Sequence, residues 1–174
     1  MLQEITLSDY QLLIQSFYGF IMPCEALIDL LTCKSVIKNR KKKPWLEQDL
    51  NALKLATNNE IKLSICNDLP VLSEYEHVLG YLYVIEGATL GGQVISKMLE
   101  TQLQISKDQG GKFFHGYGEK TKVMWTKFCK DLSNITNLEQ HYKIINSAND
   151  TFERLHEWME SVHYCETTPP KEFI

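Results

Sequence analysis

The sequence predicts an all-α protein. Apolar residues recur at helical spacing through most of its 174 residues, as they do at Tyr10, Leu13 and Phe17. No segment of useful length alternates apolar and polar residues in the manner of a strand, and the chain has no internal repeat. Its length fits one compact domain. We therefore expect residues 1–174 to form a single helical bundle, with a mobile tail over residues 165–174.

Composition excludes several classes of function. With 44% hydrophobic and 23% charged residues, the chain has the make-up of an ordinary soluble globular protein. Its net charge of −4 gives no general reason to expect nucleic-acid binding. No apolar run approaches the roughly 20 residues that span a bilayer, and the N-terminus lacks a signal-peptide pattern. The five cysteines show no C-x-x-C spacing, which predicts reduced thiols rather than disulfides or a zinc site. We expect a cytoplasmic protein.

The first helix is predicted from about Ser8, a plausible N-cap whose capping box would be completed by Gln11. Its apolar stripe continues to Leu31. Pro23 lies inside that stripe and is expected to kink or divide the helix.

Further helices follow at regular intervals. The basic run Lys38–Lys43 is interpreted as a solvated turn between helices, in preference to an anion-facing patch. A short helix is predicted over residues 45–57 and an irregular segment over 58–70, after which Ser73 would cap a long helix ending near Gln102. A glycine-rich loop over 109–118 separates this helix from two more, predicted at 120–132 and 138–163.

The long helix carries three glycines, Gly87, Gly91 and Gly92, within six residues. Each costs about 0.8–1 kcal/mol relative to alanine in a helix interior, so the bare backbone must serve some purpose. One side of the helix is nearly free of large side chains, and it comprises Gly80, Val84, Gly87, Ala88 and Gly91. Taken alone, the stripe favours close packing of another helix through G-x-x-x-G, and the alternative is a flat ligand lying against the backbone.

The string from Glu86 to Gln93, Glu-Gly-Ala-Thr-Leu-Gly-Gly-Gln, closely resembles the distal helix of heme oxygenases. It is most similar to the bacterial, phytochrome-associated branch. Other segments resemble the family in the same order, and together they cover the chain from about Leu7 to Met159: Asp9–Glu25, Pro44–Leu50, Phe113–Phe128 and Ala148–Trp158.

The resemblance implies an oxidoreductase that clamps heme between two helices and cleaves it to biliverdin, carbon monoxide and iron. Electrons would come from a separate reductase or ferredoxin, and a phytochrome is a candidate acceptor of the biliverdin. The positions matching the catalytic part of the distal helix are Gly87, Thr89 and Gly91. The positions matching heme contacts are Gly87, Ala88, Gly91, Gly92, Tyr117 and Lys122.

Three departures from the family pattern affect these expectations. Ala88 stands where many members carry an aspartate that organises distal water. Lys122 matches the first residue of a basic pair that holds the heme propionates, but Thr126 occupies the second position, with Lys127 or Lys130 as candidate replacements.

The third departure concerns the proximal histidine, which in the family precedes the segment matched by Tyr10–Glu25. The first histidine here is His77, about 15 Å before Gly87 on the same helix. We therefore expect either a bundle without the family's first helix or a functional start upstream of Met1, and no metal ligand is assigned. The other histidines are expected at surfaces or interfaces: His115, His141, His156 and His163.

Three functions remain in competition. The first is heme oxygenase activity. The second is a non-catalytic domain of the same fold that binds tetrapyrrole weakly or acts through protein contacts. The third is a helical module whose glycine stripe serves only packing or dimerisation.

Overall fold

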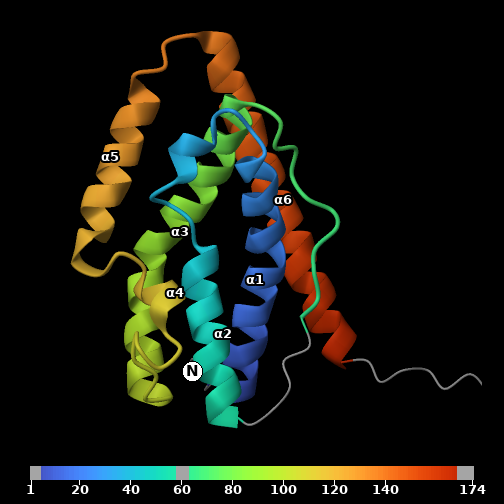
Figure 1. Cartoon of the computed structure of the whole chain (residues 1–174), viewed down its shortest axis with the longest axis vertical. Helices are drawn as coiled ribbons and strands as arrows, with labels where there is room; N and C mark the ends of the chain where they lie inside the picture. The colour runs from blue at the N-terminus through green and yellow to red at the C-terminus, as the bar shows by residue number, and fades with distance from the viewer. Residues whose placement is uncertain (1–4, 58–62, 168–174) are drawn as a thin grey trace, which may run out of the picture.

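A computed structural model describes residues 5–57 and 63–167. The elements, in order, are α1 (Leu7–Asp29), the 3-10 helix η1 (Lys34–Ile37), α2 (Lys43–Thr57), α3 (Tyr75–Gln102), α4 (Lys112–His115), the 3-10 helix η2 (Gly118–Lys120), α5 (Thr121–Ser133) and α6 (Leu138–Thr167). The described part of the chain contains no strand, which confirms the all-α prediction. In Figure 1, α3 runs between α5 on one edge of the molecule and α1 and α2, with α6 along the opposite edge.

The start of α1 differs from the prediction. Thr6 is the N-cap, and its hydroxyl accepts the Asp9 backbone N–H at 3.1 Å. Asp9 completes the capping box, since its carboxylate accepts the Thr6 backbone N–H at 3.0 Å. The Ser8–Gln11 capping box is therefore wrong by two residues, because two overlapping cap patterns lie in this short segment.

Pro23 does not divide α1, which is continuous through it. Proline has no N–H for the carbonyl four residues earlier, which belongs to Gly19. That carbonyl instead accepts the backbone N–H of Cys66 at 3.0 Å. Gly19 also lacks the Cβ that would collide with the Ser64 carbonyl, so the irregular segment 63–70 can approach closely enough to make this bond.

The packing of α3 on α6 forms the largest helix–helix contact of the bundle. At Gly80, a Cβ would lie 2.6 Å from both the Ile144 carbonyl oxygen and the Ser147 side chain. The Ser147 hydroxyl donates to the His77 carbonyl at 2.9 Å. The Gly80 end of the glycine stripe therefore serves close helix packing.

The boundaries of the long helices differ slightly from the predicted ones. Glu74 precedes α3 without a side-chain cap, and the Ser73 hydroxyl bonds the His77 imidazole at 3.1 Å instead of capping the helix. α6 continues to Thr167, past the predicted end at His163. Segments 58–62 and 168–174, which include the remainder of the expected tail, lie outside the described residues.

Two helices, α1 and α3, are long and apolar enough by length and composition alone to cross a membrane. Half of each apolar window is buried inside the bundle, as in the core helices of soluble proteins that meet the same criterion. Within the described segments, the cysteines Cys24, Cys33, Cys66 and Cys129 are free thiols.

Candidate ligand groove on α3

One face of α3 is uncovered. Its large apolar side chains Tyr83, Leu90 and Val94 are 44%, 41% and 72% exposed. A Cβ built on Gly91 would have nothing within 4 Å, whereas one on Gly87 would touch a ring of α5. These five residues share one side of the helix. We call them the open face of α3.

The neighbouring helix α5 borders the open face through Trp125. Its ring lies 3.5 Å from where a Gly87 Cβ would stand, and 5.6 Å from the Tyr83 ring, centroid to centroid. Lys122, one turn earlier on α5, is exposed. Lys127 and Lys130, the candidate replacements for the missing second basic residue, are also exposed, but they lie at other angles around α5.

A cavity of about 530 Å³ adjoins the open face at Tyr83, between α3, the end of α5 and α6. Its apolar walls include Ile144, Ile145, Ala148 and Phe152 of α6. Ile145 and Phe152 are 54% and 55% exposed, so the apolar surface continues outward along α6. Volume and lining suit an apolar ligand of moderate size.

Among the histidines that the structure describes, His141 is the one that lines this cavity. Its Nε2 lies 2.7 Å from the Ile135 carbonyl oxygen. A carbonyl only accepts hydrogen bonds, so Nε2 carries the proton in this bond. Across the described ranges, no three His, Cys, Asp or Glu side chains gather as they would around a bound metal ion.

The remaining glycine of the string is not on the open face. Gly92 is buried, and a Cβ there would lie 2.9 Å from the Phe114 carbonyl oxygen. Its bare backbone thus allows α4 to pack closely on α3.

The two small residues between Gly87 and Gly91 offer little chemistry. Thr89 is buried, and its hydroxyl donates to the Glu86 carbonyl at 2.6 Å, within its own helix. Ala88 is exposed and apolar. Neither supplies a free polar group to the open face.

The interpretation of Lys38–Lys43 as a solvated turn is wrong for Arg40 and Lys42, whereas Lys38 is exposed as expected. Arg40 and Lys42 are only 7% and 1% exposed, and both pair with Glu86, which is fully buried in α3. Arg40 Nη1 donates to Glu86 Oε2 at 2.6 Å, and Lys42 Nζ donates to Oε1. Burying a lysine and an arginine together requires such a partner, because isolated buried charge is very unfavourable.

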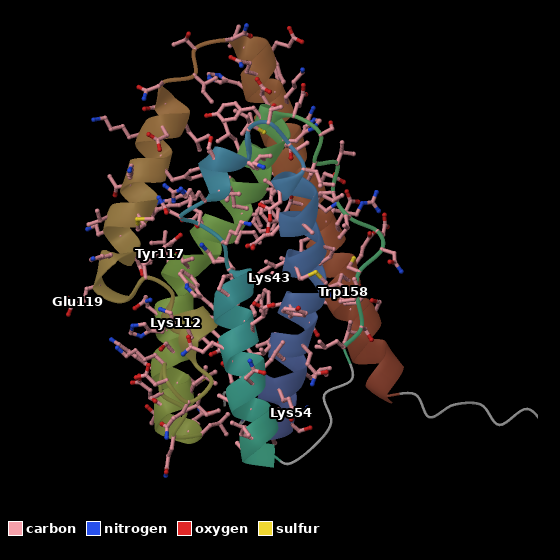
Figure 2. The ribbon with its side chains drawn as sticks, viewed as in Figure 1. Lys43, Lys54, Lys112, Tyr117, Glu119 and Trp158 are labelled. Carbon is pink, nitrogen blue, oxygen red and sulfur yellow. The ribbon has the colours of Figure 1, made fainter. Side chains whose placement is uncertain are left out.

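The half-buried Tyr117 completes this group, which we call the Glu86 cluster (Arg40, Lys42, Glu86 and Tyr117). Its hydroxyl donates to Glu86 Oε1 at 2.8 Å and accepts from Lys42 Nζ at 2.9 Å. Burial, the Glu86 charge and that hydrogen bond raise the pKa of Tyr117. Burial lowers the pKa of Lys42, and the Glu86 charge partly opposes this shift. Tyr117, expected near a propionate, uses its hydroxyl here instead; it lies in the connection into α5 (Figure 2).

The Glu86 cluster connects α3 to two other segments, namely the connection from η1 to α2 and the connection from α4 to α5. Glu86 immediately precedes Gly87, so the bonds to Glu86 fix which side of α3 presents the open face. Sequence reasoning missed this role, although a lone carboxylate directly after the apolar run from Val78 to Ile85 was a usable signal.

Comparison with known proteins agrees with this architecture. No curated protein matches the chain. The heme oxygenase family model matches residues 1–161, which is most of the sequence. The chain therefore belongs to the heme oxygenase family.

Proposed function

We propose that the chain binds heme against the open face of α3 and cleaves it oxidatively to biliverdin, carbon monoxide and iron. Membership of the family implies heme binding. The observation that supports this location is Gly91, whose missing side chain leaves open space flanked by exposed Leu90 and Val94. Gly80 and Gly92 are explained by helix packing, but Gly91 is not.

The residues present fit the organic part of heme. Gly87 and Gly91 let a flat macrocycle approach the helix backbone. Tyr83 and Phe152 offer aromatic surface to its edge. Lys122 offers a cation to a propionate from the flank of the groove.

Heme would supply the iron at which dioxygen reacts, with electrons from a separate reductase or ferredoxin. The chain's own contribution is orientation and exclusion of water. The indole of Trp125 closes the groove beside Gly87, and the bonds of the Glu86 cluster hold α3 against rotation. A cytoplasmic location and delivery of biliverdin to a phytochrome belong to the same proposal.

A second candidate function is non-catalytic tetrapyrrole binding, and one observation favours it. Ala88 has no polar group, and the Thr89 hydroxyl is held by the Glu86 carbonyl. The two residues between Gly87 and Leu90 therefore offer no free polar group to a ligand on the open face.

A heme titration followed by visible absorption, with ascorbate then added under air, tests the proposal. A sharp Soret band that decays to a biliverdin spectrum is expected. A broad spectrum resembling free heme, without turnover, would overturn the catalytic proposal. A sharp band without decay would favour the binding-only function.

Matched variants locate the site. Gly91→Leu should abolish heme binding, while Ala56→Leu, at an exposed position on α2, should leave it unchanged. His141→Ala and His156→Ala form a second pair, because His141 lines the cavity whereas His156 is exposed and does not line it. A spectrum altered by His141→Ala alone would identify the iron ligand. Unchanged binding in Gly91→Leu would refute the proposed groove.

A further inference from the structure

A second cavity, of about 600 Å³, lies on the other flank of α5. Its walls come from the η1 region, from the first turns of α3, and from α5 between Met124 and Asp131 together with the residues after its end. In Figure 1, η1 lies between α5 and α1. Lys127, Phe128 and Asp131 line it, on a side of α5 different from that of Lys122 and Thr126. The cavity is therefore separate from the proposed heme groove.

A buried arginine lines this cavity. Arg40 is 7% exposed and stacks on Phe128, with its guanidinium carbon 5.1 Å from the ring centroid. Both hydrogen bonds described for this guanidinium start at Nη1 and reach Glu86 at 2.6 Å and the Met124 carbonyl at 3.4 Å. The guanidinium also interacts with the Tyr117 side chain, and it carries five N–H groups in all, so further donors remain beside these contacts. A planar guanidinium with further N–H groups suits a carboxylate ligand.

The charges around Arg40 balance, so a ligand there is held by hydrogen bonds rather than by net charge. Arg40 and Lys42 carry two positive charges, and their directly bonded carboxylate is Glu86. Glu25, another buried carboxylate, accepts the backbone N–H of Lys42 at 2.6 Å, and its charge also acts on the Lys42 ammonium. At the cavity itself, Lys127 and Asp131 supply opposite charges to the wall.

The rest of the lining is mixed. Leu79, Phe128 and Ile135 form apolar wall, and Asn39 and Asn134 add amide groups. We propose that this cavity binds a small monocarboxylate, with its apolar body on Leu79 and Phe128 and its carboxylate on the Arg40 guanidinium. Asp131 opposes a second negative charge on the ligand. Because Arg40 also bonds Glu86, binding of the monocarboxylate to this cavity stabilises the arrangement of the Glu86 cluster by mass action.

Calorimetric titration of the full chain without heme, using sodium benzoate as the probe, tests this proposal independently of the proposed function. Benzoate should bind saturably, and benzamide, its neutral analogue, should not. Lys127→Met should weaken benzoate binding at least threefold. Lys130→Met removes the same charge from an exposed position of α5 that does not line the cavity, and should leave binding unchanged.

A third variant keeps Arg40, whose loss would also unpair Glu86. Asn39→Trp fills the cavity from an exposed position and should abolish benzoate binding while far-UV circular dichroism stays unchanged. Absence of saturable benzoate binding, equal binding of benzamide, or equal effects of the two lysine variants would each overturn the proposal.

Discussion

Glu86→Gln tests the Glu86 cluster directly, because it removes the charge and keeps the size of the side chain. Arg40 and Lys42, 7% and 1% exposed, would lose their directly bonded carboxylate. Removing one partner of a buried ion pair destabilises a protein by about 3–5 kcal/mol. Against a total of about 5–15 kcal/mol for a typical domain, the variant should unfold at a much lower urea concentration.

The same variant should change the pH dependence of stability. The pKa of Lys42 is already lowered from 10.5 by burial, and Glu86 opposes that shift. A folded-state pKa below the unfolded value means that the unfolded chain binds more protons, so stability rises with pH across the interval between them. Without Glu86 the folded pKa falls further, and this interval begins at lower pH.

Urea unfolding at pH 7 and pH 9, followed by circular dichroism, measures both effects. Glu86→Gln should lose several kcal/mol at pH 7 and recover part of the loss at pH 9. Lys42→Met in the same chain should also restore part of it at pH 7. Glu119→Gln, at an exposed position, is the matched control and should have little effect. A loss below about 1 kcal/mol, the range of exposed ion pairs, would refute the reasoning.

Three further predictions concern other residues of the bundle. Gly91→Ala should raise the free energy of unfolding by about 0.5–1 kcal/mol, because the new methyl meets no neighbour. Gly92→Ala should lower the free energy of unfolding, because its Cβ would lie 2.9 Å from the Phe114 carbonyl oxygen. Equal shifts of the two variants in urea unfolding would contradict the packing described. Burial raises the pKa of Asp49 from 3.8 to about 6, so the folded chain binds this proton more tightly than the unfolded chain does. Stability should therefore fall as the pH rises from 3.8 to about 6. Asp49→Asn should flatten the pH dependence of stability, measured by urea unfolding from about pH 4 to pH 7. Lys122→Glu should weaken heme affinity in an absorption titration, because it reverses the charge beside a propionate. An unchanged dissociation constant would mean that Lys122 is a solvated surface residue without a contact to heme.

The presence of the helices was predictable from the sequence, because it depends on the local periodicity of apolar residues. The long helix of residues 75–102 was expected almost to its ends, despite its glycines. Helix starts were harder, since Thr6 and Ser8 offer competing cap patterns and only the Thr6 box closes with Asp9. The family assignment from the glycine-rich string is confirmed by the match over residues 1–161.

The roles of individual residues in the site were less predictable, because they depend on partners far along the chain. Arg40 and Glu86 are 46 positions apart, so nothing local distinguished a buried arginine from its solvated neighbours. Likewise, Gly80 and Gly91 lie on the same helical stripe, yet one meets α6 and the other meets nothing within 4 Å. Helical periodicity gives the angle of a residue around the helix axis, but it does not give the element that packs against that residue.

The bond from Cys66 to the Gly19 carbonyl gives an irregular segment an unusual property. The Cys66 amide proton lies outside any helix, yet it closes the gap left by Pro23 in the middle of α1. Its exchange with deuterated solvent should therefore be slow and should report the opening of α1 rather than the motion of a loop. A single amide in segment 63–70 would thus serve as a spectroscopic probe of the integrity of the first helix.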